Sequence, residues 1–323
     1  MTTSNPHRED FNGPTARPTA HKQESLSGPV SAISGPLATP KQSPLTGATS
    51  PTRPAARRVG RAMRRTLANQ LSDADWSVLS DLNRYRFLQT HQLQALSRSD
   101  GPTEARALRR QLLRLTRTRL IQPVTGRRVG GLTGGADPNI WQLTAAGKAV
   151  ITGGLPGRTS SYPSTRFLTH TLATAQTAIG LQKAADSLGG SIDIQLERDA
   201  ARQIPNTGGG HTRLTPDLFA IVRAADDTGL FEDAWFVEVD CATESLPTLL
   251  RKCEQYEAYR RSGLEQLDRG VFPLVLWVFY GTTARKRIDE LRQRIERGRG
   301  FTNAMYRYAT PDQLTDVLSG GGL

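Results

Sequence analysis

Residues 214–256 read LTPDLFAIVRAADDTGLFEDAWFVEVDCATESLPTLLRKCEQY, and this stretch decides the fold. Two apolar runs flank a polar turn that contains Asp226, Asp227 and Gly229, which is the pattern of a β-hairpin with a longer loop. The second run, residues 234–241, is rich in β-branched and aromatic side chains and predicts a strand. A strongly helical segment follows it, so the stretch predicts a hairpin joined to a helix.

Three carboxylates lie in this predicted hairpin. Side chains alternate along a strand, so Glu238 and Asp240 share one face, and Asp217 stands on the paired strand. Carboxylates in an apolar strand need a partner or a cation, unless this face is a solvent-exposed edge. Lys252 and Tyr256 share one face of the following helix, because they are four residues apart. The candidate catalytic residues are therefore Asp217, Glu238, Asp240 and Lys252, a set typical of a hard-cation site that activates water for phosphodiester cleavage.

These residues also carry a family resemblance. The sequence TPD ending at Asp217, the strand ending in Glu238-Val239-Asp240, Thr243, and the helix with Lys252 and Tyr256 resemble the replication-relaxation family of mobile-element proteins over about residues 70 to 310. More distantly, they are similar to the PD-(D/E)xK nuclease-like fold. That fold implies a lysine two residues after Glu238, where this chain has Asp240, so Lys252 would have to substitute for it.

Composition points to an intracellular protein with a polyanionic partner. The 323 residues carry a formal net charge of +12, and the pI is about 10.3, as expected for nucleic-acid binding. Only two cysteines occur, Cys241 and Cys253, without metal-ligand spacing, which predicts reduced thiols. The longest apolar run, residues 272–280, is far short of the ~20 residues that span a bilayer. With no signal-peptide pattern, we expect a cytoplasmic protein without membrane contact.

Residues 1–66 predict a disordered tail that is basic at its end. The segment is rich in Ser, Thr, Pro, Gly and Ala, and such a composition buries too little apolar surface to offset the entropy of ordering. Its end gathers arginines with no acidic residue among them: Arg53, Arg57, Arg58, Arg61, Arg64 and Arg65. Such a block contacts nucleic acid through phosphates or is simply a solvated linker.

Residues 67–152 predict a winged helix-turn-helix domain. Three helices are expected, beginning near Ser72 with a capping-box spacing to Asp75, near Thr90 and near Pro102. A glycine-rich hairpin with arginines at its tip then joins residues 122–124 to a return strand, 139–143. Three helices followed by such a hairpin are the layout of a winged helix.

Charge favours double-stranded DNA as the partner of this domain. Residues 84–128 hold eleven arginines against two acidic residues, a net charge of +9. The planar guanidinium fork suits phosphates and base edges. A solvated arginine surface and a protein-binding winged helix are the alternatives. The candidate DNA-binding residues are Arg106, Arg109, Arg110, Arg114, Arg117, Arg127 and Arg128.

After a linker near residues 153–163, residues 164–318 predict a nuclease-like α/β domain. A long helix, 167–188, carries His170, which the family resemblance marks as a recurring histidine and which packing alone also explains. Around the central hairpin we expect strand 191–197, a mobile glycine loop at 208–210, helix 245–262, strand 272–280, helix 283–297 and strand 304–308. Strand 272–280 is apolar on both faces, which predicts a mixed sheet covered by helices on both sides. The whole chain is therefore expected to be α+β.

Three functions are compatible with these features. The first is a DNA-binding protein of a plasmid or mobile element, acting in replication-relaxation or transfer, whose nuclease-like domain is a degenerate scaffold for homodimerisation or for other replication or transfer proteins. The second is an active endonuclease or nickase, in which Asp217 and Glu238 hold Mg²⁺ or Mn²⁺, Lys252 steadies the scissile phosphate, and Asp240 is an extra ligand or orients Lys252. The third is a winged-helix transcriptional repressor.

Overall fold

The computed structural model describes residues 61–97, 101–124, 139–154, 163–205, 208–226 and 229–320. Most of the predicted tail, the hairpin tip with Arg127 and Arg128, and most of the predicted linker lie outside these residues. The predicted end of the tail at residue 66 is wrong, because helix α1 (Arg61–Gln70) already begins at Arg61. Leu67 anchors this helix in the apolar core. A single buried contact of this kind leaves little signal in the composition.

The N-terminal half combines small helices with a three-stranded sheet. The sheet has the order β1-β3-β2, and both strand pairs are antiparallel. The elements are α2 (Asp73–Tyr85), β1 (Leu88–Gln89), α3 (Thr90–Leu96), α4 (Pro102–Arg117), β2 (Ile121–Pro123), β3 (Ile140–Leu143) and α5 (Ala145–Thr152). All three predicted helices and both predicted hairpin strands are present.

Local sequence signals explain where two of these helices begin. Ser72 starts α2 with the predicted capping box, since its Oγ accepts a hydrogen bond from Asp75 N and its own backbone N donates to Asp75. Helix α5 was not predicted; its cap is Thr144, whose Oγ1 accepts from Gly147 N. Position 147 requires glycine, because a Cβ there would lie 2.0 Å from the carbonyl oxygen of Leu120. That close approach packs α5 against the turn after α4.

The C-terminal half is built on a five-stranded mixed sheet. The strand order is β10-β9-β8-β7-β4. Strands β4, β7 and β8 form an antiparallel meander, while β8, β9 and β10 run parallel. The main elements are α6 (Thr165–Ser187), β4 (Ser191–Leu196), β7 (Leu218–Asp226), β8 (Gly229–Asp240), α8 (Leu246–Ser262), β9 (Leu274–Phe279), α10 (Ala284–Arg297) and β10 (Tyr306–Ala309).

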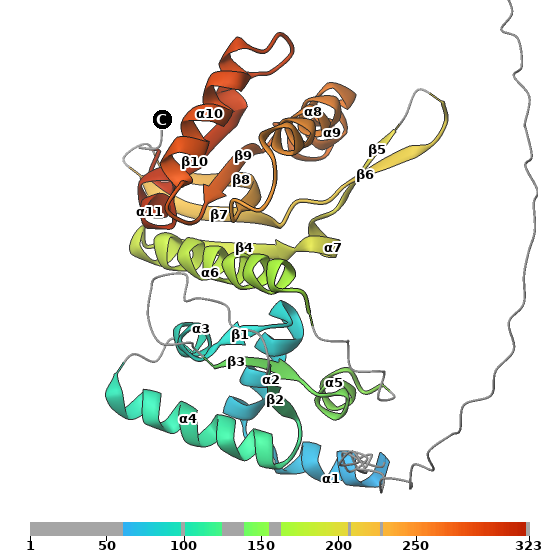
Figure 1. Ribbon diagram of the computed structural model, residues 1–323, viewed down its shortest axis with the longest axis vertical. Coiled ribbons are helices and arrows are strands. Elements are labelled where there is room, and N and C mark those ends of the chain that lie inside the picture. Colours follow the sequence, from blue (N-terminus) through green and yellow to red (C-terminus); the bar gives the residue numbers. More distant parts are fainter. Residues whose placement is uncertain are drawn as a thin grey trace, which may run out of the picture. The chain divides into compact units, whose positions relative to one another are not determined.

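Helices cover both faces of this sheet, as predicted (Figure 1). On one face, Val237 and Val239 of β8 join a buried cluster with the alanines of α6 and with α11 (Leu314–Leu318). On the other face, Phe236 of β8 packs with residues of α8 and α10. The predicted alternation along β8 is therefore confirmed. The alternative that the carboxylates face solvent at an exposed edge is wrong, because β8 lies between β7 and β9 and the side chain of Glu238 is 1% exposed.

Residues 208–210, predicted as a mobile glycine loop, lie in the connection between the two strands of a hairpin arm that was not predicted. Strands β5 (Arg202–Pro205) and β6 (His211–Leu214) pair antiparallel and project from the body of the domain (Figure 1). Ile204 and Leu214 root the arm in the core under α8, which the polar composition of this segment does not signal. The other unpredicted elements are short: α7 (Glu197–Ala200), α9 (Leu264–Arg269), and the 3-10 turns η1 (Asn303–Met305) and η2 (Pro311–Gln313).

The two halves pack against each other through α6. Phe87 and Ile140 of the N-terminal half share a buried cluster with Leu168 and Leu172 of this helix. The fully buried Gln92 of α3 donates a 2.9 Å hydrogen bond to the carbonyl oxygen of Leu172. Helix α6 therefore carries contacts to the N-terminal half on one side and to the sheet on the other.

Candidate functional site

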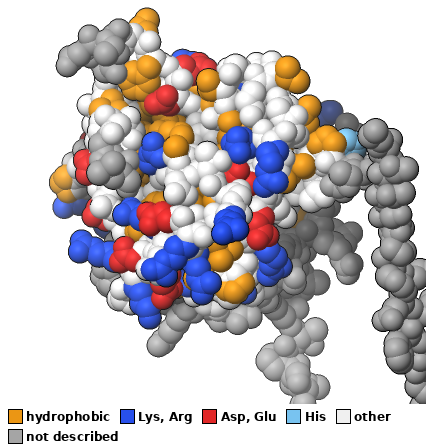
Figure 2. All heavy atoms as spheres, turned by 90° about the horizontal axis from the view of Figure 1, so that it is seen from above, with side chains coloured by type: hydrophobic (Ala, Val, Ile, Leu, Met, Phe, Trp, Pro, Cys, Tyr) orange, Lys and Arg blue, Asp and Glu red, His pale blue; other side chains and the backbone are white. Residues whose placement is uncertain are grey.

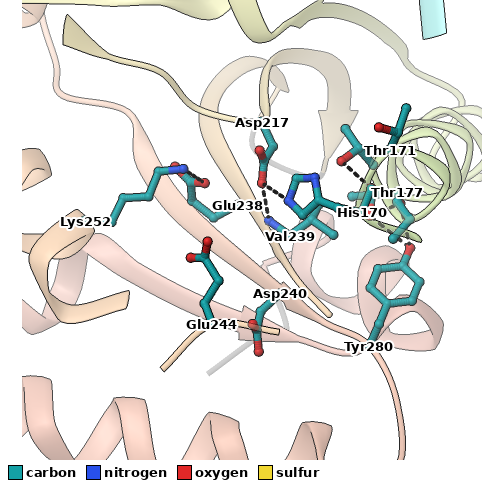
Figure 3. A network of polar contacts seen from close by, with 12 residues as sticks. His170, Thr171, Thr177, Asp217, Glu238, Val239, Asp240, Glu244, Lys252 and Tyr280 are labelled. Carbon is teal, nitrogen blue, oxygen red and sulfur yellow. Dashed lines mark hydrogen bonds and ion pairs between the residues drawn. The ribbon is translucent and has the colours of Figure 1, made fainter. Parts of the chain in front are cut away.

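The predicted site residues meet at one end of the central strands (Figure 3). Leu218 pairs with Val237, so Asp217, just before β7, lies beside Glu238 of β8. Helix α8 follows β8 and brings Lys252 and Tyr256 over the same end of the sheet. Helix α6 adds His170 from the opposite side. The spacing of Lys252 and Tyr256 thus predicted a shared face correctly.

Glu238 is held by two partners from α8. Its Oε2 forms an ion pair with Lys252 Nζ, and its Oε1 accepts a 2.5 Å hydrogen bond from the Tyr256 hydroxyl. Tyr256 is fully buried, and the side chain of Lys252 is 26% exposed. Both oxygens of this carboxylate already have a partner within the protein.

Asp217 is held separately, between β8 and α6. Its Oδ2 accepts a 2.8 Å hydrogen bond from Val239 N and lies 3.2 Å from His170 Nε2. The sequence left His170 open between packing and function; the structure places its imidazole against a candidate catalytic carboxylate (Figure 3). A carboxylate in this position fixes the orientation of the ring and stabilises the imidazolium.

Of the two roles expected for Asp240, an extra metal ligand or a partner that orients Lys252, the structure does not show the second, because Asp240 pairs with Arg287. Arg287 of α10 binds both of its oxygens, with Nε 2.5 Å from Oδ2 and Nη2 3.1 Å from Oδ1. A second hydrogen bond from Arg287 Nη2, of 2.9 Å, reaches the carbonyl oxygen of Glu244. Asp240 is thereby turned toward α10. Arg287 was missed in the sequence, because α10 follows β9, and only the pairing of β9 beside β8 brings this helix to the end of β8.

Burial and charge set the protonation of this cluster. Burial raises the pKa of Glu238 to about 7, although Lys252 acts against the shift. For Lys252, burial would lower the pKa, but Glu238 and Asp217 outweigh it, and the pKa lies above the ordinary lysine value. Burial would also raise the pKa of Asp217, yet Lys252 and the hydrogen bond with His170 lower it. The pKa of His170 is raised, because the hydrogen bond and the charge of Asp217 outweigh the effect of burial.

Each acidic side chain of the predicted metal site lies against a basic side chain of the protein. In the ranges of chain that the structure describes, no group of three or more His, Cys, Asp or Glu side chains is placed to hold a metal ion. Glu238 is paired with Lys252, Asp217 with His170, and Asp240 with Arg287. Ca²⁺ sites need six to eight oxygen ligands, whereas Mg²⁺ is usually bound through one or two carboxylates together with water molecules and substrate phosphates. Here each carboxylate is directed at its own cation.

A cavity of about 320 Å³ opens beside these residues. Seven ionisable side chains lie in its lining: the basic Arg166, His170 and Lys252 and the acidic Asp217, Glu238, Asp240 and Glu244. Phe167 and Trp277 supply aromatic surface. The cavity is therefore polar, with mixed charge and two aromatic rings.

The predicted DNA-binding arginines lie on the outer face of α4. Leu108, Leu112 and Leu115 bury the inner face of this helix. Arg106, Arg109, Arg110 and Arg117 are exposed. Arg114 is also exposed, but it forms a 2.5 Å ion pair with the buried Asp75, the same residue that caps α2. Arg114 therefore has a structural partner that the sequence did not reveal, because Asp75 is 39 residues away.

Charge is distributed differently on another face of the molecule. Figure 2 views the molecule from above in the orientation of Figure 1, where α8 to α10 lie, and Lys and Arg side chains there alternate with Asp and Glu. The exposed side of α4, by contrast, has Glu104 as its one acidic residue among five arginines.

Among the described residues, no helix is long and apolar enough to cross a membrane. Both cysteines, Cys241 and Cys253, are free thiols.

Comparison with known proteins gives one match. A family model described as Replication-relaxation matches residues 79–275, which begin within α2 and end within β9. The match therefore includes α4, His170, Asp217, Glu238, Asp240 and Lys252. Searches of the curated proteins and of the solved structures give no significant match.

Proposed function

The chain belongs to the replication-relaxation family, and from this premise we propose that it binds double-stranded DNA during the replication or transfer of a plasmid or other mobile element. The observation that carries this proposal is the exposed arginine face of α4. Guanidinium groups on one helix face suit phosphate contacts, which supply most of the affinity of a DNA-binding protein.

The arrangement around α4 supports a winged helix-turn-helix. Helix, strand, helix, helix and two further strands follow one another in the chain, and the strands form the sheet β1-β3-β2. In a helix-turn-helix domain, the second helix of the motif enters the major groove. Helix α4 follows α3 in this position and exposes Arg106, Arg109 and Arg110.

We further propose that the C-terminal half acts without metal-dependent cleavage. Its mixed sheet has the wiring expected of a nuclease-like domain, and the match to the family includes its acidic residues. The pairing of each carboxylate with a cation of the protein supports a role in binding or scaffolding. Plasmid nicking in Mg²⁺ or Mn²⁺, with the wild type beside Asp217→Ala, tests this. Nicking by the wild type that Asp217→Ala abolishes would establish the endonuclease instead.

The salt dependence of duplex binding tests the role of α4. Binding of a fluorescent duplex is measured by anisotropy over a range of salt concentrations for the wild type and for Arg106→Ala/Arg109→Ala/Arg110→Ala. We expect the slope of log K against log salt to fall by about one for each lost phosphate contact.

A matched control keeps the change in net charge the same. Arg285, Arg294 and Arg297 are exposed residues of α10, and their triple alanine variant also removes three positive charges. This variant should keep the slope of the wild type. An unchanged slope in the α4 variant, or an equal loss in both variants, would place the DNA-binding surface elsewhere.

A further inference from the structure

Phe167 is a partly solvent-exposed aromatic side chain near the start of the long helix α6. It lies in the first turn of α6, and it is 41% exposed, unlike the buried aromatic residues of the core. Its ring is nonetheless held in place. Phe87 meets it edge-on, with centroids 6.2 Å apart and planes at 88°, and the guanidinium carbon of Arg86 lies 6.0 Å from its centroid. A fixed, partly exposed ring with a neighbouring guanidinium is a platform on which another flat group can stack.

The same ring lines the cavity of the candidate site. Arg166 and His170, four residues apart on α6, line this cavity beside Phe167, and Lys252 lines it from α8. Its volume of about 320 Å³ is at the small end of the ~300–1,000 Å³ found for small-molecule pockets. The cavity therefore has room for one small polar group next to an aromatic ring.

We propose that this cavity takes one unpaired nucleotide of DNA, with the base stacked on Phe167 and its phosphate held by Arg166 and His170. This inference rests on the proposed binding of DNA and adds the form of DNA that is recognised: a duplex with an unpaired segment. A base inside a duplex cannot reach such a ring, because its faces are covered by its neighbours.

The cations at the rim are arranged so that a phosphate can bind. Arg166 pairs with Glu244 at 3.1 Å, and the two side chains are 60% and 44% exposed. Such an exposed pair contributes little, so the Arg166 fork can exchange it for the stronger bidentate contact with a phosphate. The N-cap of the 23-residue α6, Ser164, lines the same cavity, so the positive end of the helix lies beside it. Lys252 stays with Glu238 and keeps that buried carboxylate neutralised.

Stacking explains why a nucleotide fits better than another polar ligand. Every base has a flat face, so stacking on an aromatic side chain tolerates any sequence and contributes at each position where it occurs. Positive side chains beside aromatic rings are the combination found in proteins that bind single strands, and Arg166 next to Phe167 supplies it here. An origin that is melted or nicked during replication or transfer supplies such an unpaired segment.

Anisotropy with three probes tests the proposal in the full-length protein. The probes are a blunt 20-base-pair duplex and the same duplex with a five-nucleotide extension at the 3′ or at the 5′ end. We expect the wild type to bind one extended duplex more tightly than the blunt duplex, by about tenfold for one stacked base. Phe167→Ala should remove this preference and leave the affinity for the blunt duplex unchanged, whereas Phe167→Tyr should keep it. Arg166→Gln should reduce the preference in the same way.

Leu267→Ala is the matched control, because Leu267 is an apolar residue of α9 that is 85% exposed and does not line the cavity. It should keep the preference. Equal binding of all three probes by the wild type would overturn the inference, while absence of binding to any duplex would overturn the proposed function as well. A Phe167→Ala variant that loses blunt-duplex affinity and melting temperature together would make Phe167 a packing residue, and it would overturn the inference too.

Discussion

Lys252 Nζ forms an ion pair with Oε2 of Glu238, a carboxylate near the end of the central strand β8 whose side chain is 1% exposed. A positive charge supplied by α8 thus lies against one of the two carboxylates that the sequence predicted as metal ligands. This ion pair therefore contributes to the stability of the fold, because a buried carboxylate without a partner is costly.

The first prediction concerns removal of this cation. At pH 8, above the pKa of about 7 that Glu238 has in the folded protein, Lys252→Ala leaves this ionised carboxylate buried beside Asp217 with no ammonium group, so we expect the free energy of unfolding to fall by about 3 kcal/mol. Urea unfolding followed by circular dichroism measures the change. Lys286→Ala is the control, since that lysine is 76% exposed and lies 3.8 Å from Glu290; such a pair contributes ~1 kcal/mol at most. Equal stability of Lys252→Ala and the wild type would show that the ion pair does not hold the site together.

The second prediction concerns metal ions. An ion bound only by the folded protein would stabilise it by about 2.7 kcal/mol at a hundredfold excess over Kd. We expect no change of melting temperature in the wild type on adding Mg²⁺ or Mn²⁺, because Lys252 and Tyr256 already occupy both oxygens of Glu238. The comparison variant is Asp217→Asn. A metal-dependent rise in the wild type that is missing in Asp217→Asn would establish a metal site at these residues.

Much of the sheet and of the site could be predicted from short-range patterns. The alternation in β8 placed Glu238 and Asp240 on one face of the strand. The four-residue spacing in α8 placed Lys252 and Tyr256 on one face of the helix. These patterns depend on the period of a single strand or helix, which the residues themselves determine. Helix α8 lies in the connection from β8 to β9, and this connection brings Lys252 and Tyr256 against Glu238.

The partners of the charged residues could not be predicted in the same way. Asp75 and Arg114 are 39 residues apart, and Asp240 and Arg287 are 47 apart. Each pair forms because the packing of separate elements brings two side chains together that are distant in the sequence. The periodicity of a single helix or strand carries no information about such contacts. The hairpin of β5 and β6 was missed for a related reason: its polar, glycine-containing sequence resembles a loop, and the anchor is the packing of Ile204 and Leu214 under α8.

The third prediction concerns the Asp240–Arg287 pair. The side chain of Asp240 is 1% exposed and that of Arg287 is 16% exposed, and two hydrogen bonds join them. Arg287→Ala should lower the free energy of unfolding by about 3 kcal/mol, because it leaves a buried carboxylate unpaired. Arg287→Lys should recover only part of this loss, since an ammonium group cannot form the two-pronged contact. Arg285→Ala, an exposed position on the same helix, should stay within about 0.5 kcal/mol of the wild type in the same urea titration.

The last prediction concerns pH and follows from the buried Glu238. Burial raises its pKa in the folded protein from the ordinary value of 4.5 to about 7. Between these values the folded state keeps a proton that the unfolded chain has lost, so the free energy of unfolding must fall as the pH rises through this window, by about 3 kcal/mol in total. The raised pKa of His170 acts in the same direction, because its stabilising charge is lost as the pH rises above 6.5. The lowered pKa of Asp217 changes stability only in acid, and the raised pKa of Lys252 only in alkali.

Urea unfolding of the wild type and of Glu238→Gln at several values between pH 5 and pH 8 isolates the contribution of Glu238. Gln cannot titrate, so the variant should show a clearly flatter decline, with the remainder due to His170 and to groups elsewhere. Glu290→Gln, at a 42% exposed position of α10, should decline as steeply as the wild type. The same steep decline in Glu238→Gln would mean that Glu238 is ionised throughout this range, and that Lys252 outweighs burial in setting its charge.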